Sequence, residues 1–423
     1  MLTRLVGLKQ PIGVVITGMG AMGKGLLYQS TVTPGFACLG VADLKVEKAV
    51  QCVQEMGCLP RVVQSVGQAQ DAVRAGCIPV CEDGMLLSQM EGPQVLIEST
   101  SAITEAARFA IEALEHGKHL VLMNAEIDLI FGPALMQRAH AQGVTYTSCD
   151  GDQHGVIKRL IDDMRLWGFQ PVMGGNVKGF LDRTSNPTKI IPEADKRNLD
   201  YKMCTAYTDG TKLNIEMALL ANALDMRTAV PGMYGPRVKH VNDVLSHFDF
   251  DSLWRDRMPL VDYVLGAQPD GGVYAVGYCD HAFQRSLMKY YKMGDGPYYV
   301  FYRPYHLCHV EAMECVADAV LDGKSLLEPS AGFVTNVFAR AKQDLRAGDT
   351  LDGIGGYACY GLIENSPATG QHPGLPICIA EDVTLKRDIA KDEPILLSDI
   401  HYDPNRFDFE LYRQAQLCSA DSH

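Results

Sequence analysis

The sequence lacks three features: a long hydrophobic run, an excess of positive charge and a paired cysteine motif. No stretch of about 18 apolar residues is present, which argues against a membrane-spanning helix. The formal net charge of −13 disfavours nucleic acid and anionic membranes as partners, although local lysines and arginines can still hold an anionic substrate. The first residues are too weakly apolar for a signal peptide, so we expect a cytoplasmic protein.

Metal-binding and disulfide patterns are also missing. The 13 cysteines are scattered, with no C-x-x-C pair, and their odd number is typical of reduced thiols in a cytoplasmic protein. Histidines and carboxylates show no recognisable zinc-ligand spacing, so the residues themselves predict no metal site. Cys149 is the one thiol of interest, because it follows a predicted strand.

A glycine-rich turn lies near the start of the chain. The β-branched run 12–17 leads directly into Gly18-x-Gly20-x-x-Gly23, and a helix-prone segment follows. Gly18 permits a tight turn, Gly20 lets the backbone approach a pyrophosphate, and Gly23 allows the helix to pack on the strand. The motif therefore predicts a site for NAD or NADP. The loop residues expected to contact this cofactor are Gly18, Met19, Gly20, Ala21, Met22 and Gly23.

An acidic residue stands where such a site needs one. Asp43 closes the next apolar run, about 20 residues after Gly23, where its carboxylate would accept hydrogen bonds from the adenosine ribose. This favours NAD, but Lys45 would meet a 2′-phosphate, so NADP stays open. The alternative is a glycine-rich turn without a ligand. The order of strand, glycines, helix and acid favours the dinucleotide interpretation.

Strand and helix signals alternate through the first 150 residues, as a doubly wound parallel sheet requires. A helix is expected over 133–142, whereas the less regular segment 71–93 is expected to be rich in loops. Ligands of such sheets bind beyond the carboxyl ends of the strands. The polar residues at those ends are Glu98, Ser99, Thr100, Asn124, Glu126, Asp150, Asp152, Gln153 and His154, and we expect Ser99, Thr100, Asn124, Glu126, Asp152 and Gln153 to contact the cofactor.

A lysine at the start of a helix is the main catalytic candidate. Apolar residues at helical spacing predict a buried helix that begins near Asp209, a good N-cap residue. Lys212 falls in the first turn, where the helix dipole disfavours its charge, which suits a proton donor or a partner for a substrate anion. Glu216 lies one turn further on the same face. A surface Lys–Glu pair is the alternative interpretation.

A second polar cluster follows an aromatic segment, 298–302. It presents Arg303, His306 and His309 before a helix that is expected to run to about Leu321. The alternative is that this segment forms the edge of an aromatic core and that its histidines have ordinary hydrogen-bond partners there. The candidates for holding an anionic group are Lys178, Lys189, Arg303 and His306.

The chain from 334 onward predicts a small all-β module that ends in a helix around 409–417. Short strands are expected over 334–342, 375–380 and 383–385. The segments DLRAGDTL and RDIAKDEPIL look like two copies of one turn device.

Several motifs occur in one order: GMGAMG, Gly-Asp-Gln at 151–153, Asp-Gly-Thr-Lys at 209–212, YRPYHL at 302–307 and DLRAGDTLDGIGGY. In this combination the chain resembles the SAF-domain oxidoreductases. These are relatives of homoserine dehydrogenase, and they include a 1-deoxy-D-xylulose 5-phosphate reductoisomerase-like (DXR-like) enzyme. The resemblance covers nearly the whole chain. It implies a Rossmann domain over 1–150, a central α/β catalytic and oligomerisation domain over 151–333, and a C-terminal SAF (β-clip) domain over 334–423.

The resemblance implies an NAD(P)-dependent homo-oligomeric enzyme that acts on a small polyhydroxylated, phosphorylated carbonyl compound. Lys212 would stabilise an oxyanion or supply its proton, while Asp209 and Glu216 orient it or bind hydroxyls. A reductoisomerase would rearrange the carbon skeleton before reduction, with a divalent cation, Mg²⁺ or Mn²⁺, polarising the hydroxyketone. The acids that would hold this cation are Asp150, Asp152 and Glu126.

Two alternatives remain open. The first is an oxidoreductase acting on homoserine or another amino-acid-derived alcohol, but an Asn-Lys pair of that family is replaced here by Asn124-Ala125-Glu126. The second is a nucleotide-sensing or carbohydrate-binding protein without catalysis. The closer family commonly reads Ala-Gly-Lys-Gly-Thr-Lys-Tyr where this chain has Gly-Gly-Asn-Val-Lys-Gly-Phe over 174–180, so we expect a changed substrate pocket.

Overall fold

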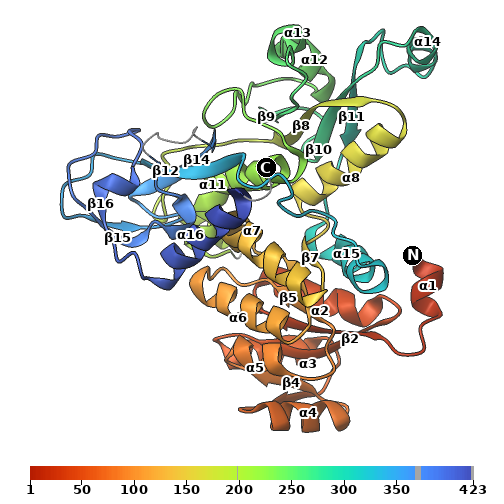
Figure 1. The fold of residues 1–423 in the computed structure, drawn as a ribbon, viewed down its shortest axis with the longest axis vertical. Helices are drawn as coiled ribbons and strands as arrows, with labels where there is room; N and C mark the ends of the chain where they lie inside the picture. The colour runs from red at the N-terminus through yellow and green to blue at the C-terminus, as the bar shows by residue number, and fades with distance from the viewer. Residues whose placement is uncertain (198, 367–372, 421–423) are drawn as a thin grey trace. The chain divides into compact units, whose positions relative to one another are not determined.

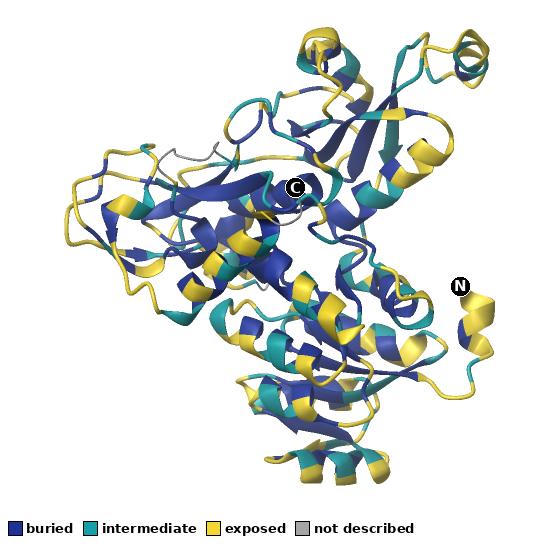
Figure 2. Cartoon of the chain, in the orientation of Figure 1, coloured by how far each residue is buried: buried dark blue, intermediate teal, exposed yellow. Residues whose placement is uncertain are grey.

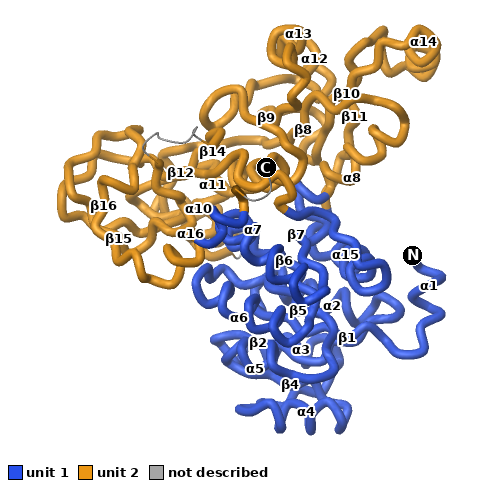
Figure 3. Tube along the Cα trace, viewed as in Figure 1, with its two compact units in different colours: residues 1–155, 307–328, 414–418 blue, residues 156–306, 329–413, 419–423 orange. Residues whose placement is uncertain are grey.

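The computed structural model describes residues 1–197, 199–366 and 373–420 (Figure 1). The chain divides into two compact units, each assembled from segments that are distant in the sequence (Figure 3). The predicted domains 1–150, 151–333 and 334–423 stay a prediction. Unit 1 comprises Met1–Gly155, Leu307–Glu328 and Gln414–Cys418, and unit 2 comprises the described parts of Val156–His306, Pro329–Arg413 and Ser419–His423.

Unit 1 is built on a seven-stranded parallel sheet with the strand order β3-β4-β2-β1-β5-β6-β7. The central strand β1 (Ile12–Thr17) is buried along its whole length, which means that both faces of the sheet are covered (Figure 2). The predicted doubly wound sheet is confirmed. The other strands are β2 (Phe36–Ala42), β3 (Pro60–Val62), β4 (Ile78–Cys81), β5 (Val95–Glu98), β6 (His119–Leu122) and β7 (Tyr146–Ser148).

The segment 71–93 is regular, so the prediction of a loop-rich excursion is wrong. It contains the end of helix α4 (Val66–Arg74), strand β4 and helix α5 (Gly84–Gln89). Strand β4 is only 4 residues long and contains Pro79, so it carries no periodic signal in the sequence. It pairs with β2 and β3 all the same. The other helices of this unit are α1 (Leu2–Val6), α2 (Ala21–Val32), α3 (Val46–Glu55), α6 (Thr104–Glu115) and α15 (Cys308–Asp322).

Helix α7 (Ala125–Gln142) starts earlier than predicted. Proline favours the first turn of a helix, but Pro133 lies inside this one. The true start is capped by Asn124, whose side-chain oxygen accepts hydrogen bonds from the backbone amides of Glu126 and Ile127 at 3.2 and 3.3 Å. The first half of α7 is buried all round, so it shows no amphipathic pattern in the sequence.

Unit 2 contains a four-stranded mixed sheet with the order β11-β10-β8-β9. Strands β8 (Gln170–Lys178) and β9 (Leu260–Leu265) are parallel, while β10 (Val273–Tyr278) is antiparallel to β8 and to β11 (Tyr298–Arg303). Trp254 and Tyr274 belong to its buried core. The mixed α/β region expected in the middle of the chain is confirmed. The helices of this region are α8 (Gln153–Leu166), α9 (Ile191–Arg197), α10 (Tyr201–Thr208), α11 (Thr211–Leu224), η1 (Val241–Asp243), α12 (Val244–His247), α13 (Phe250–Leu253) and α14 (Ala282–Tyr290).

The C-terminal part of unit 2 consists of small antiparallel sheets, as predicted. Strand β12 (Thr335–Ala341) pairs with β14 (Cys359–Asn365), and β15 (Glu381–Leu385) pairs with β13 (Thr350–Asp352) and β16 (Ile400–His401). The strand expected over 375–380 is wrong, because its centre forms a short 3-10 turn, η2 (Ile377–Ile379). A short buried apolar run does not distinguish these two structures. A further turn η3 (Leu397–Asp399) and helix α16 (Phe407–Ala420) are the last elements of the described residues.

The two turn segments that look alike in the sequence lie side by side. Leu345 and Ile389 form a bridge in which each backbone amide donates to the other carbonyl, at 2.9 and 3.0 Å. The described helices include none that is long and apolar enough to cross a membrane.

Candidate active site

The glycine-rich turn joins β1 to α2 in unit 1. Gly18 has a φ of +86°, and a Cβ there would lie 2.7 Å from the Thr100 amide nitrogen and 2.8 Å from the Ser99 carbonyl oxygen. A Cβ on Gly23 would lie 1.7 Å from the Gly18 carbonyl oxygen. Gly20, the N-cap residue of α2, differs from both, because a Cβ there would meet nothing within 4 Å. The turn is thus closed on its inner side and open at the helix N-terminus, as a pyrophosphate-binding loop requires.

Asp43 follows β2 and holds this turn. Its Oδ2 accepts a hydrogen bond from the Met19 amide at 2.6 Å, and its Oδ1 accepts one from the Lys45 amide at 2.8 Å. A carboxylate has about four acceptor sites, so these two bonds leave capacity for ribose hydroxyls. The residues present therefore fit a dinucleotide.

The end of β5 lies against the glycine-rich turn. The Ser99 hydroxyl donates to the carbonyl oxygens of Thr17 and Gly18 at 2.8 and 3.0 Å, so it fixes the turn. Glu98 is fully buried and accepts a hydrogen bond from the Thr100 amide at 2.8 Å. Burial raises the pKa of Glu98 to about 8, which makes a neutral acid of this residue at neutral pH.

The other cofactor candidates of unit 1 are buried polar residues after β6 and β7. Asn124 caps α7 and also donates from its side-chain amide to the Ala102 carbonyl oxygen at 2.7 Å. Glu126 follows it in the first turn of α7. Asp152 and Gln153 stand where β7 gives way to α8. Their contact with the cofactor stays a prediction. All four side chains belong to residues that are at most 8% exposed.

Lys212 and Glu216 are both buried in α11, so they do not form a surface pair. Lys212 lies in the first turn of this helix, as predicted, but the N-cap residue is Gly210 and not Asp209. Asp209 is instead the C-cap residue of α10 (Tyr201–Thr208), and its backbone amide donates to the Thr205 carbonyl at 2.8 Å. Its Oδ1 still accepts a hydrogen bond from the Thr211 amide at 2.9 Å.

The candidates for holding an anionic group are spread over several elements of unit 2. Lys178 ends β8 and Arg303 ends β11, and both are half-buried. The Arg303 guanidinium lies 4.6 Å from the centre of the Tyr305 ring. Lys189 is exposed, and its ammonium donates to the backbone and side-chain oxygens of Thr184 at 3.1 and 2.8 Å.

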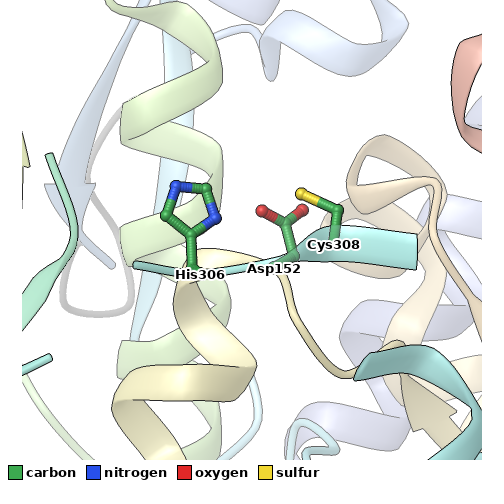
Figure 4. A group of neighbouring side chains, drawn as sticks. All are labelled: Asp152, His306 and Cys308. Atoms are coloured by element: carbon green, nitrogen blue, oxygen red, sulfur yellow. The ribbon is translucent and has the colours of Figure 1, made fainter. Parts of the chain in front are cut away.

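Asp152, His306 and Cys308 are neighbouring side chains of residue types that bind metals in proteins (Figure 4). One ligand atom of each residue lies within 4.8 Å of the others. Sequence reasoning selected Asp152 and His306 but missed Cys308, because His306-Leu307-Cys308 is not a recognised ligand spacing and Asp152 is distant in the chain. The group offers one oxygen, one nitrogen and one sulfur atom, whereas Mg²⁺ and Mn²⁺ prefer oxygen ligands.

Comparison with known proteins finds a family model that matches part of the chain. Residues 151–312 match the family described as "Oxidoreductase DRL, catalytic domain". The matched range holds all six residues predicted to be catalytic, and they are Lys178, Asp209, Lys212, Glu216, Arg303 and His306. No curated protein matches the chain significantly.

Several solved structures are similar to parts of this chain. A probable dehydrogenase from Thermotoga maritima is 7% identical, with a TM-score of 0.43, over 74% of this chain and 90% of that one. A scyllo-inositol dehydrogenase from Lactobacillus casei, solved with NAD(H) and scyllo-inositol, is 11% identical, with a TM-score of 0.37, over 63% and 74% of the two chains. The 1-deoxy-D-xylulose 5-phosphate reductoisomerase from Zymomonas mobilis, solved with NADPH, is 15% identical, with a TM-score of 0.34, over 49% and 57%.

At such low identities these likenesses say nothing about the substrate. The family match covers the part of the chain that carries Lys212, and unit 1 carries a dinucleotide-type turn. Together they support an NAD(P)-dependent oxidoreductase.

Proposed function

We propose that this chain is an NAD(P)-dependent oxidoreductase whose substrate is a small polyhydroxylated, phosphorylated carbonyl compound. The observation that carries the proposal is Lys212, a buried lysine in the first turn of α11, inside the range that matches an oxidoreductase catalytic domain. The open turn at Gly20 supports the cofactor class. Bound there, the nicotinamide would supply hydride to a carbonyl carbon or accept it from an alcohol.

Lys212 donates to the oxygen atom of the reacting carbonyl. When hydride adds to the carbon, the oxygen gains an electron pair and needs a proton, and the Lys212 ammonium donates a hydrogen bond and then that proton. In the oxidation direction the neutral amine takes the proton back. Glu216 orients the ammonium in this scheme, and Asp209 holds the turn before it.

The anionic end of the substrate is bound by cationic side chains of unit 2 in this proposal. Lys178 and Arg303 stand at the ends of two strands, and His306 follows the second of them. Arginine and lysine form charge-assisted hydrogen bonds with phosphate oxygens. Lys189 is the weaker candidate, because its ammonium already donates to Thr184.

A reductoisomerase of the 1-deoxy-D-xylulose 5-phosphate type is the more specific form of the proposal. Its carbon skeleton would rearrange before reduction, and Asp150, Asp152 or Glu126 would hold the Mg²⁺ or Mn²⁺ that such chemistry uses. No step above depends on this cation, because the group around Asp152 does not fit an all-oxygen site. We also propose a homo-oligomer in the cytoplasm, and sedimentation of the purified protein measures the number of subunits.

Nicotinamide absorbance tests the proposal. NADPH and then NADH are mixed with the protein and 1-deoxy-D-xylulose 5-phosphate, with Mg²⁺, with Mn²⁺ or with a chelator, while homoserine oxidation is followed alongside. Consumption of the reduced cofactor with the sugar phosphate supports the proposal, and product analysis then decides whether rearrangement occurs. Turnover of homoserine alone would contradict the substrate class, and absence of cofactor binding would contradict the enzyme class.

A further inference from the structure

A buried lysine outside the predicted site connects three segments of unit 2. Lys342 follows β12, and its ammonium donates to Asp209 Oδ2 at 2.9 Å and to the carbonyl oxygens of Ser185 and Gly356 at 2.8 Å each. The side chains of Lys342 and Asp209 are only 4% and 0% exposed. An ammonium has three N–H groups, so each of them has an acceptor here.

This saturation excludes a direct chemical role for Lys342. A proton donor must release a hydrogen bond to reach its substrate, whereas Lys342 would leave a buried carboxylate and two carbonyls without a donor. Removing one partner of a buried ion pair is strongly destabilising, so the arrangement resists change. Its effect must therefore pass through the groups that it holds.

The group of interest among these is Asp209. Its second oxygen, Oδ1, accepts the hydrogen bond from the Thr211 amide, and Thr211 is the first residue of α11. Lys212 is the next residue. Lys342 therefore fixes, through one carboxylate, the turn that places Lys212 at the start of its helix.

Strand β14 holds the same turn through separate hydrogen bonds. The Gly361 amide donates to the Thr211 hydroxyl at 2.9 Å, and the Ile363 amide donates to the Asn214 side-chain oxygen at 2.9 Å. The Asn214 side-chain amide in turn donates to the Gly210 carbonyl at 2.8 Å. Hydrogen bonds thus attach the C-terminal β strands to the first turn of α11.

We propose that Lys342 is a positioning residue for Lys212 and that the C-terminal β strands form part of the catalytic framework of unit 2. The inference rests on the proposed function for its catalytic consequence. In this proposal these strands act together with α11 and not as a separate module. Lys342 acts on the reaction only through Asp209 and the turn.

Hydrogen–deuterium exchange and turnover test this role together. The variant Lys342→Met is compared with Lys202→Met, because Lys202 also joins α10 to the C-terminal strands, by bonds to the Asp352 carbonyl at 3.0 Å and to Glu381 at 2.9 Å, without touching Asp209. Peptides over 205–216 should exchange faster in Lys342→Met and at the wild-type rate in Lys202→Met. The kcat of Lys342→Met should fall by about 100-fold, the effect of a displaced catalytic group, with KM much less changed.

A double variant covers the case in which Lys342→Met does not fold. Lys342→Met with Asp209→Asn removes both buried charges, which is far less costly than removing one. We expect it to bind NADPH like the wild type while peptides over 205–216 still exchange fast. Wild-type exchange and wild-type kcat in this variant would overturn the proposal, and so would equal effects of Lys342→Met and Lys202→Met. If the wild type turns over no carbonyl substrate, the proposed function fails, and the exchange rates alone still decide whether Lys342 positions the turn.

Discussion

At the scale of single residues, position decides which polar groups are candidates for chemistry. Lysine and glutamate usually lie at the surface, yet Lys212 and Glu216 are both buried within one turn of each other. The sequence predicts their spacing and the helix that carries them. The sequence does not predict that the two residues are buried, because an ion pair on the surface of a helix has the same spacing.

Substitution of Lys212 tests its proposed role. Lys212→Met keeps most of the side-chain volume and removes the proton donor, so kcat should fall by at least about 100-fold, as expected for the loss of a general acid. NAD(P)H affinity, measured by cofactor fluorescence, should not change. Lys289→Met, at an exposed ion pair with Asp295, is the control. A Lys212→Met enzyme with wild-type kcat would remove Lys212 from the mechanism.

The raised pKa of Glu98 predicts that the stability of the protein depends on pH. Its pKa is raised by burial from 4.5 to about 8, so between these values the folded protein keeps a proton that the unfolded chain releases. Stability should therefore fall as pH rises through this window, by up to about 1.4 kcal/mol per pH unit.

The variant Glu98→Gln isolates this effect. Glutamine keeps the acceptor for the Thr100 amide but does not titrate, so Tm should fall less steeply with pH than in the wild type. Glu115→Gln on the exposed side of α6 is the control and should follow the wild type. Parallel Tm curves for Glu98→Gln and the wild type would contradict a neutral Glu98.

At the scale of elements, the glycine-rich turn shows how a backbone conformation becomes a functional feature. Gly18 and Gly57 both have positive φ, +86° and +74°, so alanine costs about 1–2 kcal/mol at either position. Only at Gly18 does the new Cβ also collide, at 2.7 Å from the Thr100 amide nitrogen. Gly57 has nothing within 4 Å.

This difference yields a matched pair of variants. Gly18→Ala should move the turn and abolish binding of NADH and NADPH, measured by fluorescence titration. Gly57→Ala should lower Tm slightly and leave cofactor affinity unchanged. Equal cofactor affinities of the two variants would show that the turn does not form the site.

Elements with strong local signals are the ones that the sequence predicts. Strand β1, the glycine-rich turn and the start of α11 combine β-branched runs, glycines and helical spacing, and the structure confirms them. The sequence does not predict strand β4 or the first half of α7, because β4 is too short and α7 is too uniformly buried there to show a period. The contact between Lys342 and Asp209 lies beyond such reasoning, since it joins residues that are distant in the chain.

At the scale of the whole molecule, unit 1 depends on a late segment of the chain. The Leu327 carbonyl accepts a hydrogen bond from the Ser148 amide at 2.9 Å, and the Leu326 amide donates to the Thr147 hydroxyl at 3.0 Å, so residues 307–328 cover the edge strand β7. No local sequence pattern predicts that residues 307–328 pack on strand β7.

A fragment experiment follows from this arrangement. Residues 1–155 alone leave the edge of β7 unpaired, and such edges promote aggregation. A fusion of 1–155 to 307–328 through a short linker should be monomeric, melt at a higher temperature and bind NADH. A fusion with a scrambled 307–328 sequence is the control. Equal Tm and equal NADH affinity of 1–155 and the fusion would contradict the dependence.

The central claim is that this chain moves hydride between a nicotinamide and a carbonyl carbon with the help of Lys212. The most direct measurement is single-turnover transfer of deuterium from C4-deuterated NADPH or NADH to a panel of phosphorylated and unphosphorylated polyhydroxy ketones and aldehydes, with the products analysed by mass spectrometry. The account predicts one deuterium at the former carbonyl carbon with wild-type protein and almost none with Lys212→Met. Bound cofactor without deuterium in any product, or equal transfer by both proteins, would contradict it.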